Sequence, residues 1–237
     1  MNAARTVRLP RGLLIAIEGI DGAGKTTQAT MLTGHLDKLP VATVSSKEPT
    51  SGPWGARIRA SAETGRMSPA DELFAFMEDR KEHVAGLIAP ALERGAVVVL
   101  DRYYLSTATY QGARGLDAAQ ILRDNEAFAP RPDLLVIIEL APELAVARIG
   151  ERGGTNAFET IDNLRAVHAG FAALGAPYNI LRVDGSLGPL QVHEAIRDAA
   201  NALIFGTMMS ASRAVELDDS IPAEDKAAAL VRRLAPA

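Results

Sequence analysis

Short runs of apolar residues alternate with longer mixed segments along the chain. Such runs, rich in branched aliphatic residues, lie at 13–18, 41–46, 96–100, 134–140 and 178–183. Their length suits strands that are buried on both faces of a parallel sheet, and the segments between them are long enough to form helices. The pattern therefore predicts an α/β fold with a five-stranded parallel sheet and helices on both faces.

Helix-forming signals fill most of the segments between these runs. Ser68 followed by Pro69 is a favoured helix start, because serine accepts a backbone N–H and proline fits the first turn. The helix that begins there is expected to run to Arg94, with a kink near Ala89 because Pro90 has no N–H to donate. Further helices are predicted at 25–39, 57–63, 117–128, 142–151, 164–174 and 190–205.

The two ends of the chain differ from its alternating middle. Residues 1–12 carry three arginines before the first apolar run and are expected to form a short disordered leader. Residues 13–205 are predicted to form one domain, and residues 206–237 a C-terminal appendage with a helix at about 220–233. A docked or loosely ordered tail is the simpler interpretation of this appendage, and a regulatory or oligomer contact is the alternative.

Composition narrows the class of protein. The 237 residues are 48% hydrophobic and 23% charged, with a net charge of -4 and no cysteine. A net acidic chain is a poor general binder of nucleic acids, and a chain without cysteine has no disulfide, thiolate metal site or cysteine nucleophile. No apolar run approaches the roughly 20 residues that span a bilayer. We therefore expect a soluble cytoplasmic protein with neither nucleic acid nor a membrane as its partner.

One stretch carries a complete phosphate-binding motif, G-x-x-x-x-G-K-[ST], between a predicted strand and a predicted helix. Its glycines let backbone N–H groups point at an anion, and the helix that follows adds the positive end of its dipole. Lys25 is predicted to reach the β- and γ-phosphates of ATP, and the Thr26 hydroxyl to bind Mg²⁺. The residues expected to bind ATP are Gly19, Ile20, Asp21, Gly22, Ala23, Gly24, Lys25, Thr26 and Thr27.

The motif alone leaves the class of P-loop protein open. A GTPase would carry a guanine-specifying Asn-Lys-x-Asp stretch, which the chain lacks, and a motor or large ATPase would need a longer chain. A small kinase fits the length.

A second acidic–basic pair, Asp101 and Arg102, ends the predicted strand at 96–100. In open α/β sheets the carboxyl ends of the strands line the ligand crevice. Asp101 is therefore a candidate for the Mg²⁺ shell or for orienting an acceptor, and Arg102 for clamping an acceptor phosphate with two parallel hydrogen bonds. A structural ion pair at a strand end is the alternative interpretation.

Residues 101–112, DRYYLSTATYQG, resemble the signature of thymidylate kinases, which are P-loop nucleoside monophosphate kinases that convert dTMP and ATP to dTDP and ADP. Residues 17–25, 47–49 and 73–80 resemble further segments of that family in the same order. The resemblance covers about residues 13–204. It implies the three-layer sandwich of P-loop NTPases, dTMP and ATP as substrates, Mg²⁺ as cofactor and a homodimer.

The resemblance also implies roles for side chains on the acceptor side. Phe76 is expected to stack on the thymine ring, although by itself it would pass for a core residue of a helix. Arg80 is expected to reach a thymine carbonyl or the phosphates, and Arg102 to hold the dTMP phosphate. The other implied substrate-binding residues lie along the base edge, near the sugar or near the phosphate: Thr107, Gln111, Tyr110, Asp21 and Glu48.

A lid over ATP is predicted near residues 148–160. Arg148 and Arg152 are four residues apart on one helix face and lead into Gly-Gly-Thr-Asn at 153–156, which is typical of a segment that moves. One or both arginines are expected to supply a cation to the transferring phosphoryl group, because phosphoryl transfer depends on charge neutralisation. A solvated helix charge is the alternative role for either arginine.

Two rival functions are also compatible with the sequence. The nearer one is a kinase for another pyrimidine nucleotide or deoxynucleoside, since Thr50 and Ser51 stand where the family has a glycine pair and Asp79 adds charge beside Arg80. The rival of a different class is a non-catalytic regulatory P-loop protein that binds ATP and signals through its tail.

Overall fold

Five parallel strands form the centre of the molecule, for which a computed structural model describes residues 7–151, 159–216, 218 and 220–234. The strand order is β2-β3-β1-β4-β5. Every neighbouring pair is parallel, which confirms the predicted α/β sheet. The strands are β1 Leu13–Glu18, β2 Thr43–Lys47, β3 Val97–Asp101, β4 Leu134–Glu139 and β5 Ile180–Asp184.

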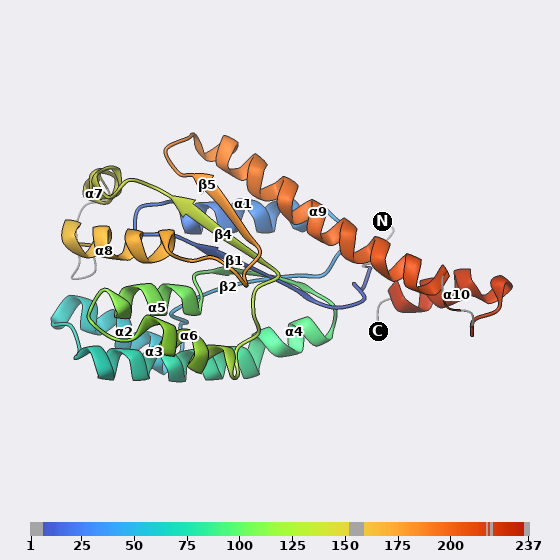
Figure 1. Cartoon of the computed structure of the whole chain (residues 1–237), viewed down its shortest axis with the longest axis horizontal. Helices are drawn as coiled ribbons and strands as arrows, with labels where there is room; N and C mark the ends of the chain where they lie inside the picture. Colours follow the sequence, from blue (N-terminus) through green and yellow to red (C-terminus); the bar gives the residue numbers. More distant parts are fainter. Residues whose placement is uncertain (1–6, 152–158, 217, 219, 235–237) are drawn as a thin grey trace.

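Helices cover both faces of the sheet, as Figure 1 shows. On one face lie α1 Lys25–Leu36 and α9 Pro189–Glu216. On the other lie α2 Pro53–Thr64, α3 Pro69–His83, α4 Ala89–Glu93, α5 Tyr104–Gly112 and α6 Ala118–Glu126. Helices α7 Pro142–Glu151 and α8 Ile161–Ala172 lie toward the carboxyl ends of the strands, and α10 Ala223–Leu234 packs against α9.

The register of the two central strands positions the site. Strands β1 and β3 are almost completely buried, and Ile17 of β1 pairs with Asp101 of β3. The loop that follows β1 and the turn that follows β3 therefore leave the sheet side by side at its carboxyl edge. Ligands of open α/β sheets bind at this edge.

The helix that follows Ser68 changes its hydrogen-bond pattern just before Ala89, where the sequence predicts a kink. The Ser68 hydroxyl accepts the N–H of Asp71 at 3.1 Å, so the cap works as predicted. A π-helical turn, Val84–Ile88, separates α3 from α4 just before Pro90. Because proline has no N–H to donate to the carbonyl four residues earlier, the ladder of hydrogen bonds adjusts there.

The structure differs from the expectation at both ends of the chain. Residues 7–12 are packed rather than disordered: Val7 pairs with Val41, and Leu9 is buried and donates its N–H to the Gly95 carbonyl at 3.2 Å. The last core helix continues past Phe205 to Glu216, because a single glycine at 206 costs a helix only about 1 kcal/mol. None of the described helices is long and apolar enough to cross a membrane.

Candidate functional site

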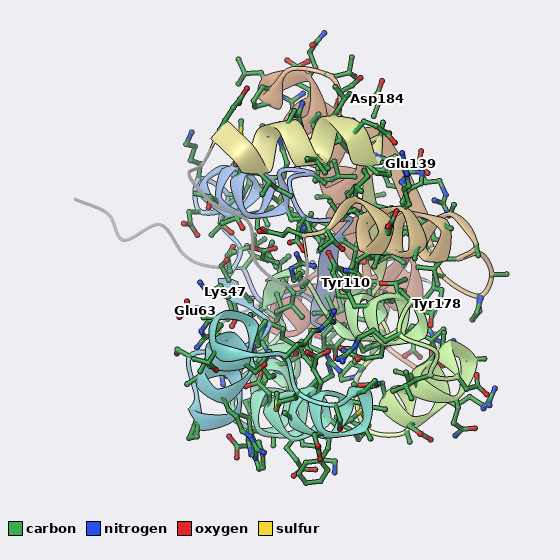
Figure 2. All side chains as sticks on the ribbon, turned by 90° about the vertical axis from the view of Figure 1, so that its left-hand side faces the viewer. Lys47, Glu63, Tyr110, Glu139, Tyr178 and Asp184 are labelled. Carbon is green, nitrogen blue, oxygen red and sulfur yellow. The ribbon has the colours of Figure 1, made fainter. Side chains whose placement is uncertain are left out.

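The phosphate loop and the acidic–basic pair meet at the carboxyl edge of the sheet. Figure 2 looks onto this edge, where Lys47, Glu139 and Asp184 end strands β2, β4 and β5. Tyr110 of α5 lies near the middle of the same view. Its hydroxyl donates to Asp21 Oδ2 at 2.8 Å and accepts the Asp21 N–H at 3.2 Å. Helix α5 is thus bound directly to the loop that follows β1.

The phosphate loop has the backbone that its glycines predict. Gly19 and Gly22 have φ values of 142° and 83°, in the region that favours glycine. A side chain at either position would also collide with its neighbours, since a Cβ would lie 2.6 Å from the Ile138 oxygen or 2.8 Å from the Ala145 oxygen. The loop therefore has its tight curvature only because these positions are glycine. It leads into the N-terminus of α1 at Lys25.

Lys25 is folded back over the phosphate loop. Its Nζ donates to the Ile20 carbonyl at 2.7 Å, and the side chain is buried. Burial, followed by the positive charge of Arg102, lowers the pKa of Lys25 to about 8. The carboxylates of Asp21, Asp101 and Glu18 act in the opposite direction. A lysine in this environment gains charge stabilisation when an anion approaches.

The two residues predicted to hold Mg²⁺, Thr26 and Asp101, lie side by side with their side-chain oxygens in contact. Thr26 Oγ1 donates to Asp101 Oδ2 at 2.5 Å, which joins the start of α1 to the end of β3. The other carboxylate oxygen, Asp101 Oδ1, is buried and has no hydrogen-bond partner among the described residues. A buried carboxylate oxygen without a partner is costly unless a ligand satisfies it. A hydroxyl and a carboxylate suit a hard divalent cation, so these residues fit Mg²⁺.

Arg102 occupies a backbone conformation that is rare for a side chain of its size. Its φ is 69°, in the left-handed region, and such strain persists at functional sites when the surroundings enforce it. The guanidinium forms an ion pair with Asp21, donates to Ser106 Oγ at 3.2 Å and lies 5.3 Å from the ring centre of Tyr110. Burial disfavours its charge, but the nearby carboxylates, Asp21 first, raise its pKa above the usual value. Arg102 is thus a fixed cation.

A cleft with an empty volume of about 710 Å³, partly open to solvent, begins at Arg102. It runs between the loop after β2 and helices α2, α3 and α5. Seven of the eight residues predicted to bind the acceptor line it: Asp21, Glu48, Phe76, Arg80, Arg102, Thr107 and Tyr110. Six further residues complete the wall: Pro49, Ile58, Arg59, Ala62, Tyr103 and Ser106.

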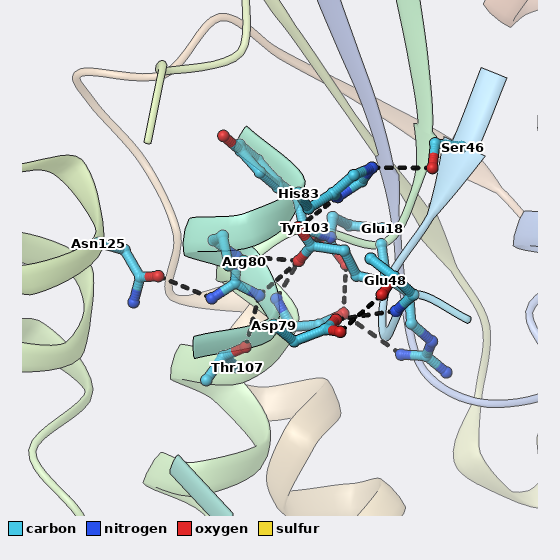
Figure 3. Close-up of polar contacts among 12 residues, drawn as sticks. Glu18, Ser46, Glu48, Asp79, Arg80, His83, Tyr103, Thr107 and Asn125 are labelled. Carbon is cyan, nitrogen blue, oxygen red and sulfur yellow. Dashed lines mark hydrogen bonds and ion pairs between the residues drawn. The ribbon is translucent and has the colours of Figure 1, made fainter. Parts of the chain in front are cut away.

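Arg80 and Glu48 form a buried ion pair in the wall of the cleft, drawn in Figure 3. Arg80 Nε and Nη2 both donate to Glu48 Oε2, at 2.9 and 2.5 Å. Nη2 also donates to Thr107 Oγ1 at 2.9 Å, and Nη1 donates to Asn125 Oδ1 at 2.7 Å. These contacts use four of the five N–H groups of the guanidinium. The fifth, on Nη1, has no hydrogen bond to any of the described residues, and Arg80 lines the cleft.

Two buried residues hold the loop that carries Glu48. His83 Nδ1 lies 3.0 Å from Glu48 Oε1, and its Nε2 lies 2.8 Å from Ser46 Oγ. Asp79 accepts the Thr50 N–H at 2.8 Å and the Thr50 hydroxyl at 2.6 Å. The carboxylate of Asp79 is therefore hydrogen-bonded to this loop. Asp79 is the residue that, from the sequence, adds charge beside Arg80. Neither it nor His83 lines the cleft.

Arg59 and Ser106 are site residues that the sequence analysis missed. Arg59 of α2 lines the cleft, and its Nη1 donates to the carbonyls of Pro49 and Thr50 at 3.0 and 2.7 Å. A signal existed for Ser106, since it lies in the segment that resembles the thymidylate kinase signature. Arg59 had no signal beyond an ordinary exposed helix arginine.

Gln111 is the one predicted acceptor residue outside the cleft. It is completely buried, and its Nε2 donates to Glu72 Oε2 at 2.8 Å. Glu72 also binds Arg66 and Arg114, so Gln111 belongs to a structural cluster between α3 and α5. Its predicted contact with the base therefore finds no support in the geometry. Of the two predicted lid arginines, Arg148 is half-buried on α7 and Arg152 lies outside the described residues.

Comparison with known proteins identifies close relatives. A family model for thymidylate kinase matches residues 17–196. The thymidylate kinase of Xanthomonas campestris pv. campestris is 56% identical over 169 residues, which are 71% of this chain and 74% of that protein. That of Xylella fastidiosa is 52% identical over 170 residues, 71% of this chain and 78% of that protein. That of Akkermansia muciniphila is 48% identical over 189 residues, 80% and 91% of the two chains.

Proposed function

The chain belongs to the thymidylate kinase family, and on this premise we propose how its cleft carries out the family's reaction, transfer of the γ-phosphoryl group of ATP to dTMP. The products are dTDP and ADP. The observation that carries the proposal is the position of the cleft: it begins at Arg102, beside the phosphate loop, and seven predicted acceptor residues line it. ATP and dTMP are thereby expected to meet head to head.

The phosphates of ATP bind along residues 19–27. Backbone N–H groups of the glycine loop and the N-terminus of α1 face the anion, which the helix dipole favours. Lys25 exchanges its hydrogen bond with the Ile20 carbonyl for the β- and γ-phosphate oxygens. The pKa of Lys25 is about 8 without a ligand, and phosphates bound nearby favour the charged form of this lysine.

The Thr26 hydroxyl and the Asp101 carboxylate are the groups that would hold Mg²⁺. The Oδ1 atom of Asp101 has no hydrogen-bond partner among the described residues. When bound, the ion neutralises charge on the β- and γ-phosphate oxygens.

The acceptor phosphate binds to Arg102, with Arg59 as a second cation that lines the same cleft. Two guanidiniums suit the doubly charged phosphate of a nucleoside monophosphate. Asp21 and Tyr110, which bind each other, lie beneath the sugar, where the bulk of the tyrosine favours deoxyribose. Asp21 thereby also keeps Arg102 in place before the acceptor arrives.

The base binds further along the cleft. Phe76 stacks on the pyrimidine, and the remaining N–H of Arg80 donates to a ring carbonyl. Thr107 lies beside that group, with its hydroxyl oxygen already accepting from Arg80. The buried pair of Arg80 and Glu48 fixes the direction of this donor, so a thymine carbonyl is recognised without reorganisation.

Transfer requires alignment and charge neutralisation rather than a strong base. An oxygen of the dTMP phosphate, already ionised near neutral pH, attacks the γ-phosphorus, and the bond from that phosphorus to the β,γ-bridging oxygen breaks. Lys25 and Arg102 hold the reacting groups in line, and the electron pair of the broken bond remains on ADP. Arg148, on α7, supplies a further cation, whereas most of the lid predicted near residues 148–160 lies outside the described residues.

A homodimer is expected from the family, and the exposed Phe74 of α3, which packs edge-on against Trp54 of α2, offers an apolar contact surface for it. The cytoplasm is the expected compartment, in keeping with a chain without cysteine.

A coupled assay of ADP release across acceptors tests the function. The protein with ATP and Mg²⁺ should release ADP fastest with dTMP, more slowly with dUMP and dCMP, and least with thymidine. Fast turnover with thymidine or with another monophosphate would favour the rival pyrimidine kinases, and ATP binding without acceptor-dependent turnover would favour the regulatory protein. The three relatives named above are thymidylate kinases and support neither rival.

A further inference from the structure

Glu18 is a completely buried acid at the end of β1, directly before the phosphate loop. Its Oε1 accepts the backbone N–H groups of Tyr103 and Ser106, at 2.8 and 3.1 Å. Its Oε2 accepts the Ser106 hydroxyl at 2.5 Å. The carboxylate thus accepts three hydrogen bonds from the N-terminal end of α5. It does not line the acceptor cleft.

Arg102 lies directly before this helix, in the short connection between β3 and α5. Ser106 Oγ, which donates its only hydrogen to Glu18, accepts from Arg102 Nη1 at 3.2 Å. Arg102 also donates its backbone N–H to the Ile17 carbonyl at 3.0 Å, so two consecutive residues of β1 hold the turn. With its φ of 69°, Arg102 is strained, and a strained residue keeps its conformation only where the surroundings fix it.

We propose that Glu18 is a positioning residue for phosphoryl transfer: through Ser106 and the first turn of α5, it sets the direction in which the Arg102 guanidinium meets the acceptor phosphate. The inference rests on the proposed function, because it assigns the acceptor phosphate to Arg102. Glu18 touches no substrate in this arrangement and acts through its hydrogen bonds to Tyr103 and Ser106.

The position of the carboxylate also decides which groups can bind the acceptor phosphate. A helix N-terminus is a ready anion site, and α5 begins at the edge of the cleft with no side-chain cap from Tyr103 at its N-cap position. Glu18 already takes two of the N–H groups at this end. These two N–H groups are therefore not free for the acceptor phosphate, which is bound instead by Arg102, the side chain that Glu18 positions through Ser106.

The free-energy cost of burying the Glu18 charge agrees with a role in positioning rather than in stability. Burial raises the pKa of Glu18 to about 7, against the hydrogen bonds of Ser106 and the charge of Arg102, which lower it. Lys25 is the second cation that interacts with it. A buried acid held at such a cost usually has a functional reason.

Two variants test the inference. Glu18→Gln keeps an oxygen for the backbone N–H groups, but its amide nitrogen cannot accept from Ser106. Ser106→Ala removes the link and leaves the bonds from Glu18 to the backbone. With ATP and dTMP, each is expected to lower kcat at least tenfold, while the Kd of ATP stays within twofold. The double variant should be no slower than the slower single variant, because both break one connection.

Asp133→Asn is the matched control. Asp133 accepts the Leu14 N–H at 2.8 Å and pairs with Arg11 at the opposite end of β1, so its loss should leave kcat unchanged. Wild-type kcat in Ser106→Ala, or losses that multiply in the double variant, would overturn the inference, even if Glu18→Gln fails to fold. A wild-type protein without dTMP-dependent turnover would instead overturn the proposed function on which the inference rests.

Discussion

Arg80 and Glu48 form an ion pair whose side chains are only 1% and 2% exposed, with Nη2 and Oε2 2.5 Å apart. Removing one partner of such a pair leaves an uncompensated buried charge, which costs about 3–5 kcal/mol. Arg80→Met should therefore lower the free energy of unfolding by about this amount in urea titrations, besides weakening dTMP binding.

A second substitution separates the charge from the packing. If Glu48→Gln is added to Arg80→Met, no charge is left unpaired, and the double variant should recover part of the lost stability. A double variant less stable than Arg80→Met would contradict the interpretation of the pair. Arg165→Ala, which removes an exposed pair with Glu143, should cost less than about 1 kcal/mol.

Phe76 and Phe74 provide a matched pair on α3. Phe76 lines the cleft, whereas Phe74 is 55% exposed and packs against Trp54. Loss of base stacking costs about 1–3 kcal/mol, so Phe76→Ala should raise the Kd of dTMP roughly 5- to 150-fold. Calorimetric titration with dTMP checks this, and Phe74→Ala should bind dTMP as the wild type does. Equal Kd values for Phe76→Ala and wild type would remove the stacking role.

Asp101 is expected to set the dependence on magnesium. Asp101→Asn replaces an oxygen acceptor by an amide and should raise the Mg²⁺ concentration needed for half-maximal turnover about 10- to 100-fold. The control is Asp198→Asn, on the exposed side of α9, where the requirement should not change. An unchanged magnesium requirement in Asp101→Asn would show that Asp101 lies outside the metal site.

Glu18 should leave a signature in the pH dependence of stability. Its pKa is raised from 4.5 to about 7, so between these pH values the folded state binds a proton more tightly than the unfolded chain does. The free energy of unfolding therefore falls as the pH rises through this window, by about 3 kcal/mol from this group alone. Glu18→Gln should lack that contribution.

Urea unfolding at pH 5 and pH 8 measures this difference. Both proteins share all other titrating groups, so subtracting one pH dependence from the other isolates Glu18. The two dependences should differ, with the wild type losing more stability toward pH 8. Parallel dependences would mean that burial does not raise the pKa of Glu18.

Arg148 tests the predicted lid. Arg148→Ala should lower kcat with little change in the KM of dTMP, because the cation is required only when charge moves to the bridging oxygen. Arg165→Ala, on the exposed surface of α8, is the control. Wild-type kcat in Arg148→Ala would leave the role of lid cation to another residue.

The sheet and the phosphate loop could be predicted because their signals are local. Continuous apolar runs mark buried strands, and a glycine motif between strand and helix marks the phosphate site. Helix α5 could not be predicted from local signals, because its N-terminal end is held by a distant residue. Glu18 lies 85 and 88 residues away from Tyr103 and Ser106, the residues that it binds there. Its aromatic and β-branched residues also favour strands.

The acceptor site could be predicted from resemblance, but not the direction of each side chain. Thr107 and Tyr110, three residues apart on α5, share the face that lines the cleft, whereas Gln111 beside them turns to the buried Glu72. Only the packing of α3 against α5 decides between these directions. Arg59 is brought to the cleft by the close approach of α2 to the preceding loop, which Gly55 permits, since a Cβ there would lie 1.9 Å from the Thr50 oxygen.

The transfer of labelled phosphate from ATP to dTMP can be followed directly. The protein is incubated with ATP labelled in its γ-phosphate, with dTMP and Mg²⁺, and the nucleotides are separated. The label is expected in the β-phosphate of dTDP, in equal amount to the ADP formed, and Arg102→Ala should greatly slow its appearance. Label that stays in ATP or is released as inorganic phosphate would contradict the proposed transfer.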